Sequence, residues 1–291
     1  MKITIEELRY KQSRPLSEKI EMSQCVIEQW YGHWNGQVYI SFSGGKDSTV
    51  LLDLVRKTFP EVPAVFIDTG LEYPEIKEFV RTKSNVVTLR PKLSFRQVID
   101  KWGYPVISKE QSRYLFDIQT SNSEKLKNIR LQGNKWGRGK ISKKWLFLCD
   151  APFRISHKCC DELKKKPASK YEKETNKKGF LGTIASESNM RTETYLRYGC
   201  NMYERNRPIS QPLSFWLEQD ILEYLRFIPY SKIYNMGYVR TGCMFCAFGT
   251  HLEKTPNKFQ LMKITHPKLY EYCMNDLGIK EVLEYVGVPY K

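Results

Sequence analysis

Six consecutive residues have the composition of a phosphate-binding loop: Ser43, Gly44, Gly45, Lys46, Asp47 and Ser48. They lie between an apolar run at 38–42 and a helical pattern at 47–59, where backbone N–H groups and the positive end of the helix dipole favour an anion. Two glycines let the backbone approach a phosphate, and Lys46 neutralises its charge. The hydroxyls of Ser43, Ser48 and Thr49 could donate to its oxygens. The loop is too short for a Walker motif, and the competing interpretation is a capped glycine turn.

Four of the eight cysteines form two closely spaced pairs, Cys159 with Cys160 and Cys243 with Cys246, and 82 residues lie between the pairs. In a reducing compartment such thiols serve more often as metal ligands or catalytic groups than as disulfides. The spacing C-x-x-C is typical of zinc knuckles, and four thiolates also satisfy an iron–sulfur cluster. The pattern therefore predicts a cysteine-ligated metal site, occupied by iron and sulfur or by zinc.

The other cysteines have weaker patterns. Cys200 is a fifth candidate ligand that could replace Cys159 or Cys160, because adjacent side chains do not easily point the same way. Cys149 is a sixth. Cys25 and Cys273 are expected to be core thiols.

Alternating strand and helix patterns must position the loop. Apolar β-prone runs at 38–42, 64–68 and 85–89 alternate with helical patterns at 47–59 and 95–102, and a further strand is expected at 179–184 after a charged helix at 163–178. Ser214 is expected to cap a helix at 215–227, a loop is expected at 237–251, and a helix at 267–285. Strands that alternate with helices imply an α/β fold with a parallel sheet, whose ligands bind at the carboxyl ends of the strands.

Charge divides the chain further. The net charge of +15 favours phosphate-bearing ligands or a solvated basic surface. Residues 121–147 contain Lys125, Lys127, Arg130, Lys135, Arg138, Lys140, Lys143 and Lys144 with Trp136 and Trp145, and one acid, Glu124. We expect an N-terminal part of a nucleotide-binding domain at 1–110, a basic insertion at 111–150, the remainder of that domain at 151–230, and a metal-binding helical region at 231–291.

Several of these segments resemble the PP-loop N-type ATP pyrophosphatases, and within them the phosphoadenosine phosphosulfate reductase family. Residues 43–48 resemble the PP-loop, 66–75 the second strand and its turn, 182–188 with Arg191 the third motif, and 212–216 the approach to a late helix. The resemblance implies a Rossmann-like sheet of the adenine nucleotide alpha-hydrolase type flanked by helices, with a cysteine-bearing C-terminal region.

The resemblance also implies functional residues. Lys46, Asp47, Asp68 and Arg191 would be catalytic, Asp68 by ribose or metal and Arg191 by a phosphate or acceptor. The nucleotide would contact residues 43–48, Asp68, Gly182 and Glu187. Cys159, Cys160, Cys243 and Cys246 resemble the ligands of a four-iron [4Fe-4S] cluster in adenylylsulfate reductases. A strand-end cap for Asp68 and a surface ion pair for Arg191 are the competing interpretations.

One family feature is missing from the sequence, which contains no segment resembling the Glu-Cys-Gly-Leu-His thiol segment of the reductases. The chain is therefore expected to be nearer to the sulfur-insertion proteins of DNA phosphorothioation. These use ATP and Mg²⁺ to adenylylate an acceptor and release pyrophosphate before sulfur arrives. The alternatives are an adenylylsulfate or phosphoadenylylsulfate reductase and a non-catalytic nucleotide- or nucleic-acid-binding module.

The expected partners are an adenine nucleotide, a sulfur-donor protein and a nucleic acid, DNA or RNA, bound through 121–147. No apolar run approaches the roughly 20 residues of a membrane helix, and residues 1–7 lack the apolar stretch of a signal peptide. A cytoplasmic protein is therefore expected. The sequence names neither the acceptor nor the sulfur donor.

Overall fold

The structure is a computed structural model that describes residues 3–291. The prediction that the chain lacks a signal peptide used residues 1–7, of which Met1 and Lys2 lie outside the described residues. The chain folds as two compact units built from interleaved segments. Unit 1 contains the described part of Met1–Asp68, with Pro74–Leu89 and Ala168–Ile233. Unit 2 contains Thr69–Tyr73, Arg90–Pro167 and Tyr234–Lys291. The segment boundaries expected from the charge pattern stay a prediction.

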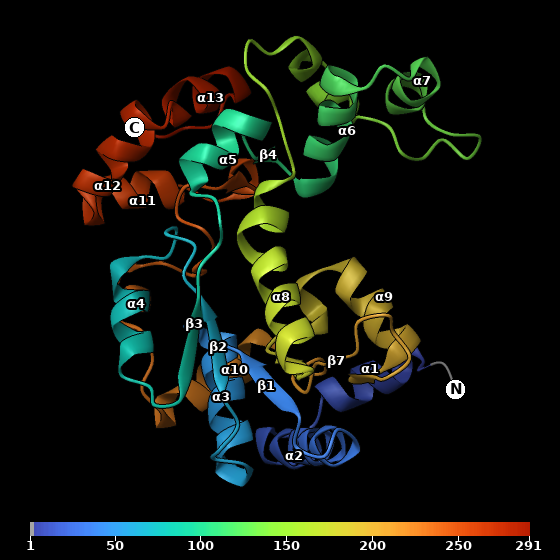
Figure 1. Ribbon diagram of the computed structural model, residues 1–291, viewed down its shortest axis with the longest axis vertical. Coiled ribbons are helices and arrows are strands. Elements are labelled where there is room, and N and C mark those ends of the chain that lie inside the picture. Colours follow the sequence, from blue (N-terminus) through green and yellow to red (C-terminus); the bar gives the residue numbers. More distant parts are fainter. Residues whose placement is uncertain (1–2) are drawn as a thin grey trace. The chain divides into compact units, whose positions relative to one another are not determined.

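Unit 1 is built on a six-stranded sheet in the order β3-β2-β1-β5-β7-β6 (Figure 1). Its strands are β1 (Val38–Ser41), β2 (Ala64–Ile67), β3 (Val86–Leu89), β5 (Lys178–Leu181), β6 (Asn201–Met202) and β7 (Ile209–Ser210). All neighbouring pairs are parallel except β6 with β7. The sheet confirms the expected α/β fold with a Rossmann-like parallel sheet. Strand order reverses at β1, whose neighbours are β2 and β5, and such a switch point opens a ligand crevice at the carboxyl ends of the strands.

Helices cover both faces of this sheet. The helices of unit 1 are α1 (Ile5–Gln12), α2 (Leu16–His33), α3 (Lys46–Thr58), α4 (Pro74–Arg81), α8 (Lys166–Thr175), α9 (Asn189–Tyr198) and α10 (Glu218–Tyr224). On one face Tyr39 of β1 packs with Val65 and with Tyr171 of α8. Side chains alternate along a strand, so Ile40 points to the other face, as does its partner Phe180. The Phe180 ring lies 6.4 Å from that of Trp30, which places α2 on this second face.

The helix expected at 215–227 begins later than predicted, and Ser214 is not its cap. Helix α10 starts at Glu218 and is followed by a short 3-10 turn, Leu225–Phe227. The Ser214 hydroxyl donates to the carbonyl of Gln211 at 2.9 Å. Phe215 and Trp216 are buried core residues in the turn before the helix. Their burial, rather than helical periodicity, produces the apolar pattern at this position.

Unit 2 is mainly helical around a two-stranded parallel sheet of β4 (Val106–Ile107) and β8 (Ala247–Phe248). Its helices are α5 (Phe95–Trp102), α6 (Lys109–Thr120), α7 (Glu124–Gln132), α11 (Lys258–Thr265), α12 (Pro267–Glu271) and α13 (Ile279–Val286). Helical turns of other types lie at Lys143–Asp150, Asp161–Lys165, Thr250–Leu252 and Tyr272–Asp276, and a further turn, Lys232–Met236, begins in unit 1 and ends in unit 2. The loop expected at 237–251 therefore carries β8 and one 3-10 turn.

No helix within residues 3–291 is both long enough and apolar enough to span a lipid bilayer.

Candidate functional site

The predicted phosphate loop connects β1 to α3 at the switch point of the sheet. Gly44 has a φ of +73°, and a side chain there would meet Ile76 Cγ2 at 2.8 Å and Val80 Cγ2 at 2.9 Å, so only glycine fits. Gly45 is the N-cap of α3, and no side chain caps the helix. The N–H groups of the first turn thus retain the capacity to bind an anion.

The hydroxyl groups of the loop fix its shape. Ser48 and Thr49 each donate to the carbonyl of Gly45 at 2.9 Å, and both side chains are buried. Ser43 Oγ lies 3.0 Å from Ser48 Oγ and accepts a hydrogen bond from the Gly45 amide at 3.3 Å. These groups therefore hold the backbone around the expected anion, and in this structure the hydroxyls of Ser48 and Thr49 are already used within the loop.

Lys46 has a carboxylate partner that the sequence pattern did not indicate. Its side chain is buried and its ammonium group pairs with Glu218, the first residue of α10. Glu218 lies 172 residues away in the sequence and is about half exposed. A polyphosphate at the loop would compete with this carboxylate for Lys46.

Asp47 lies among the charges of the same site. Burial raises the pKa of its carboxyl group, and Lys46 and Arg191 oppose this shift, while Glu218 adds to it. The structure therefore brings Lys46, Asp47, Arg191 and Glu218 together, although only the first three were expected from the sequence. The unpredicted member comes from a helix whose start the sequence misplaced.

The remaining predicted nucleotide residues lie at the ends of neighbouring strands. Asp68 follows β2 and forms an ion pair with Lys77 of α4 at 2.7 Å. Gly182 follows β5, and a side chain at this position would meet the carbonyl oxygen of Asp47 at 2.7 Å. The segment after β5 thus packs against the first turn of α3.

Glu187 and Arg191 form an ion pair with each other within the third motif. Glu187 lies in a 3-10 turn, and Arg191 lies in the first turn of α9, whose N-cap Ser188 accepts from the Arg191 amide at 3.3 Å. An ion pair of Arg191 is the alternative to a catalytic role that the sequence left open. It also places Arg191 within electrostatic range of Asp47.

Unit 2 gathers Cys159, Cys160, Cys243 and Cys246, which we call the cysteine cluster. Cys159 Sγ lies 4.0 Å from Cys160 Sγ, and both Cys243 and Cys246 are within electrostatic range of this pair. Lys164 faces Cys243 and Cys160, and its electrostatic interaction with Cys243 is the main reason that the pKa of Lys164 is raised. Among the described residues, no three or more His, Cys, Asp and Glu side chains form a group that could hold a metal ion as the structure stands.

The thiols of the cysteine cluster differ in acidity. A hydrogen bond from Cys159, together with Lys109 and Lys164, lowers the pKa of Cys160 to about 6 against the cost of its burial. The same hydrogen bond raises the pKa of Cys159, and burial of this thiol raises it further. Burial raises the pKa of Cys246 to about 11, while Lys258 and the backbone N–H of Phe248 act in the opposite direction.

The other cysteines lie outside the cluster. Cys200 belongs to unit 1, where Lys11 and Ser214 are its polar neighbours, and burial raises the pKa of its thiol to about 12. Cys273 is buried, as expected. The expectation for Cys25 was wrong, because its side chain is exposed on α2. The apolar neighbours of Cys25 in the sequence point to a different side of the helix, with Ile27 fully buried.

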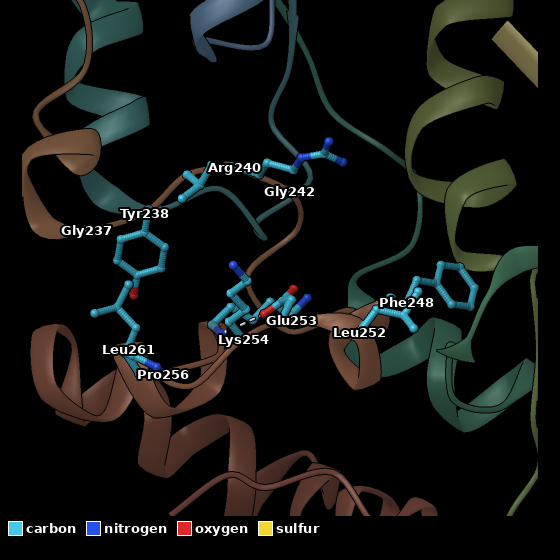
Figure 2. Close-up of a pocket in the computed structure, with 13 residues that line it drawn as sticks. Gly237, Tyr238, Arg240, Gly242, Phe248, Leu252, Glu253, Lys254, Pro256 and Leu261 are labelled. Carbon is cyan, nitrogen blue, oxygen red and sulfur yellow. Dashed lines mark hydrogen bonds between the residues drawn. The ribbon is translucent and has the colours of Figure 1, made fainter. Parts of the chain in front are cut away.

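A cavity of about 600 Å³ lies beside the C-x-x-C loop within unit 2 (Figure 2). Its wall includes Arg240, Gly242, Phe248, Lys254 and Lys258. Lys258 also acts electrostatically on Cys246. The cavity therefore adjoins the cysteine cluster and carries basic side chains on its wall.

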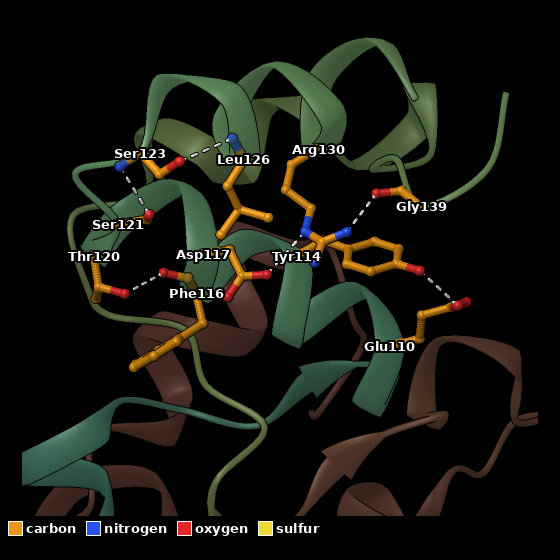
Figure 3. Close-up of polar contacts among 10 residues, drawn as sticks. All are labelled: Glu110, Tyr114, Phe116, Asp117, Thr120, Ser121, Ser123, Leu126, Arg130 and Gly139. Atoms are coloured by element: carbon orange, nitrogen blue, oxygen red, sulfur yellow. Dashed lines mark hydrogen bonds and ion pairs between the residues drawn. The ribbon is translucent and has the colours of Figure 1, made fainter. Parts of the chain in front are cut away.

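The basic segment at 121–147 is only partly available to a ligand. Arg130 is bound within the unit, 2.8 Å from Asp117 and over the ring of Tyr114 (Figure 3). Lys127 pairs with Glu124 at 3.0 Å. Trp145, expected to stack on bases, is buried at 7% exposure and packs against His251, whereas Trp136 is 70% exposed. The spacing in the sequence could not distinguish these two tryptophans.

Comparison with known proteins identifies a family for this arrangement. The sequence model described as the phosphoadenosine phosphosulfate reductase domain matches residues 37–102 and 104–248. An uncharacterised protein of Methanocaldococcus jannaschii is 26% identical over 87% of this chain and 51% of its own length. A second protein of that organism is 28% identical, over 86% of this chain and 43% of its own length. This chain thus spans about half the length of these two curated relatives.

Other relatives are named as reductases. Adenosine 5'-phosphosulfate reductase of Geobacillus kaustophilus is 23% identical over 81% of this chain and 83% of its own length. The solved phosphoadenylyl-sulfate reductase of Candida auris is 16% identical, with a TM-score of 0.44 and coverage of 84% of this chain and 97% of that one. The family match covers well over half of the chain and includes the loop at 43–48, the third motif and the cysteine cluster. The chain belongs to the phosphoadenosine phosphosulfate reductase family, whose members bind adenine nucleotides.

Proposed function

We propose that this protein is an ATP-dependent adenylylating enzyme of sulfur transfer that acts on a nucleic acid. The observation that carries the proposal is the uncapped N-terminus of α3 with the buried cation Lys46 at the switch point of the sheet. This is a site for the phosphates of a nucleotide. The relation to the sulfur-insertion proteins of DNA phosphorothioation is part of this proposal.

The proposed reaction begins with attack of an acceptor oxygen on the α-phosphorus of ATP. The bond between the α-phosphorus and its bridging oxygen breaks, pyrophosphate leaves, and the acceptor carries AMP. Lys46 and the amides of α3 would neutralise charge on the departing pyrophosphate, with Arg191 near the acceptor. Mg²⁺, with Asp68 among its expected ligands, would supply further charge neutralisation. A sulfur species then displaces AMP from the acceptor.

The cysteine cluster is proposed to hold a [4Fe-4S] cluster. Four thiols within electrostatic range of one another, with Lys164 to offset negative charge, supply the number and type of ligands that such a cluster needs, although in their present positions they do not form a metal-binding group among the described residues. The basic cavity next to Cys246 is the proposed entry for the sulfur species delivered by a donor protein.

A second candidate is adenosine 5'-phosphosulfate reduction, which the names of several relatives favour. Such a reaction needs a thiol that can reach the sulfur of the substrate. In the C-terminal part of the described chain, Cys273 is fully buried and packed in the turn Tyr272–Asp276. This burial favours adenylylation over reduction.

The decisive experiment measures pyrophosphate release from ATP, with and without single-stranded or duplex DNA and RNA. We expect release by the parent protein, and loss of release in Lys46→Ala with the fold retained by circular dichroism. Sulfite release from adenosine 5'-phosphosulfate in the presence of a dithiol, without any pyrophosphate release from ATP, would establish the second candidate. Binding of nucleotide with neither product would indicate a non-catalytic module.

The metal assignment has its own test. Protein purified without oxygen should show the broad visible absorption of an iron–sulfur cluster, with iron and sulfide by chemical analysis. Cys243→Ser and Cys246→Ser should lose this absorption, while Cys25→Ser, an exposed thiol of unit 1, should keep it. Full zinc occupancy without iron would overturn the assignment.

A further inference from the structure

A short turn after α7 holds one tryptophan in solvent. We call residues 133–141 the Trp136 turn. Within it the Asn134 amide donates to the Arg138 carbonyl at 2.8 Å, and the Gly137 amide donates to the Asn134 carbonyl at 2.7 Å. The side-chain oxygen of Asn134 accepts from the amides of Trp136 and Arg138, each at 3.0 Å. Four hydrogen bonds to one asparagine therefore fix the backbone that carries Trp136.

The same turn is attached firmly to the rest of unit 2. Arg130 of α7 donates to the carbonyl of Gly139 at 3.0 Å (Figure 3). The backbone carbonyl of Arg130 accepts a hydrogen bond from the Ile141 amide at 2.8 Å. Ile141 is buried. Gly133 has a φ of +97°, and a side chain there would meet the backbone of Gly137 at 3.0 Å. The turn is thus an ordered part of the unit, so little conformational entropy remains to be lost when a ligand contacts Trp136.

The segment that carries the exposed indole is strongly basic. Six cations of the segment are exposed, and none of them forms an ion pair within residues 3–291: Lys125, Lys135, Arg138, Lys140, Lys143 and Lys144. The Lys135 ammonium lies 4.3 Å from the centroid of the Trp136 ring, and the indole is nevertheless 70% exposed. Exposed cations beside an accessible aromatic ring match the two parts of an unpaired nucleotide, its phosphate and its base.

We propose that the Trp136 turn binds single-stranded nucleic acid, with an unpaired base stacked on Trp136 and the adjacent phosphates on Lys135, Arg138 and Lys140. This deepens the proposed function, on which it rests for nucleic acid as the acceptor, by naming the unpaired strand as the form that is bound. Bases inside a duplex are stacked on each other and cannot cover the indole. A duplex would therefore use the cations without Trp136.

The exposed groups favour this ligand over a membrane surface. Membrane-bound segments combine basic residues with a broad apolar face. No residue of α7 is buried and its exposed residues are mostly polar, so the tryptophan of the turn has little apolar surface around it. The exposed groups therefore suit a ligand that offers an aromatic surface and negative charge together.

The test is fluorescence anisotropy with labelled oligo-dT and oligo-U strands and with a duplex of equal length, in the absence of ATP. Trp136→Ala should weaken single-strand binding by about 5- to 150-fold, the range for loss of one stacked base, and should leave duplex binding within about twofold. Trp136→Phe should recover part of the loss. Phe227→Ala, which removes an aromatic ring of similar exposure from unit 1, should leave both affinities unchanged.

A salt titration measures the phosphate contacts. Replacing Lys135, Arg138 and Lys140 together by alanine should reduce the slope of log affinity against log salt by roughly two for single strands, because each contact contributes about 0.7. An unchanged single-strand affinity in Trp136→Ala, or equal losses for single strand and duplex, would overturn the proposal. Binding to anionic lipid vesicles that is lost in Trp136→Ala, without single-strand binding, would overturn it as well.

Lys46→Ala separates this inference from the proposed reaction. The Trp136 turn lies in unit 2 and Lys46 in unit 1, so we expect Lys46→Ala to bind oligo-dT with the parent affinity. Single-strand binding through Trp136 without pyrophosphate release would leave this inference standing while the proposed function fails. Pyrophosphate release with no role of Trp136 in strand binding would support the proposed function and overturn this inference.

Discussion

The ammonium group of Lys46 already has a carboxylate partner in Glu218, so a nucleotide must replace one anion with another. Glu218 is about half exposed, and ion pairs of such exposure contribute about 0.2–1 kcal/mol. In Glu218→Gln we therefore expect tighter ATP binding, by up to about fivefold, because the competing and repelling negative charge is gone. Titration calorimetry measures this, with Glu223→Gln, an exposed carboxylate of the same helix, as the control. Weaker binding would show that Glu218 assists the nucleotide, for example through Mg²⁺.

Asp47 gives the site a pH dependence in the absence of nucleotide. Burial raises the pKa of its carboxyl group in the folded protein, so the folded state holds this proton to higher pH than the unfolded chain. This contribution to stability is fully present below the unfolded pKa of Asp, near 4, and is lost as the pH rises through the folded pKa. Asp47→Asn should therefore be more stable than the parent at pH 7, and the difference should shrink as the pH falls toward 4.

Urea unfolding of both proteins at pH 4 and pH 7, without nucleotide, measures this difference. Asp150→Asn, a change of an exposed carboxylate in unit 2, is the control and should alter stability little at either pH. Lower stability of Asp47→Asn at pH 7 would mean that attraction by Lys46 and Arg191 exceeds the cost of burying the carboxylate.

At the scale of elements, the close approach of the segment after β5 to the start of α3 constrains Gly182. A methyl group there would meet the backbone of Asp47 at 2.7 Å, and backbone cannot move aside as a flexible side chain can. We expect Gly182→Ala to lower the free energy of unfolding by roughly 1–3 kcal/mol, as overpacking does elsewhere, and to weaken ATP binding because α3 is displaced.

The matched control is Gly32→Ala. Gly32 lies within α2, and a side chain there would meet no atom within 4 Å. Alanine is the better helix former, so this variant should be at least as stable as the parent, with a gain of at most about 1 kcal/mol so close to the end of the helix. Denaturant titration of both variants compares them directly, and equal stability of Gly182→Ala and the parent would show that the strand and helix can separate.

The elements themselves were predictable from the sequence where local pattern decides them. The first strands, the loop and α3 follow from apolar periodicity and glycine position, and the structure confirms them. The predicted start of α10 was wrong because Phe215 and Trp216 are buried without being helical. The role of Glu218 beside Lys46 could not be predicted either, because it depends on a contact between residues 172 positions apart.

Tertiary packing also decided which aromatic residues remain available. Trp136 and Trp145 are both flanked by lysines in the sequence, and the Lys144 ammonium lies 4.7 Å from the Trp145 ring much as Lys135 lies over Trp136. Trp145 is nevertheless covered by His251, a residue more than 100 positions later. Burial of this kind has no signature in local composition.

At the scale of the whole molecule, the chain passes between the two units at 68–69, 73–74, 89–90, 167–168 and 233–234. The nucleotide residues belong to unit 1 and the cysteine cluster to unit 2. Residues 69–73 follow Asp68 directly, and Leu71 accepts a hydrogen bond from the Met244 amide of the C-x-x-C loop at 2.9 Å. Contiguous charge patterns cannot reveal such interleaved connections.

A ligand stabilises the unit that binds it by mass action, and this yields a test for where the nucleotide binds. At 100 times its dissociation constant a ligand adds about 2.7 kcal/mol to the folded state, which slows exchange about 100-fold for amides that exchange only through unfolding of that state. With an ATP analogue that cannot be cleaved at the α,β position, hydrogen exchange should slow in peptides covering 43–58 and 182–191. Peptides covering 109–120 and 258–265, in unit 2, should change much less. Lys46→Ala should remove the protection, whereas slowing of similar size in both units would mean that their unfolding is coupled or that the nucleotide contacts unit 2.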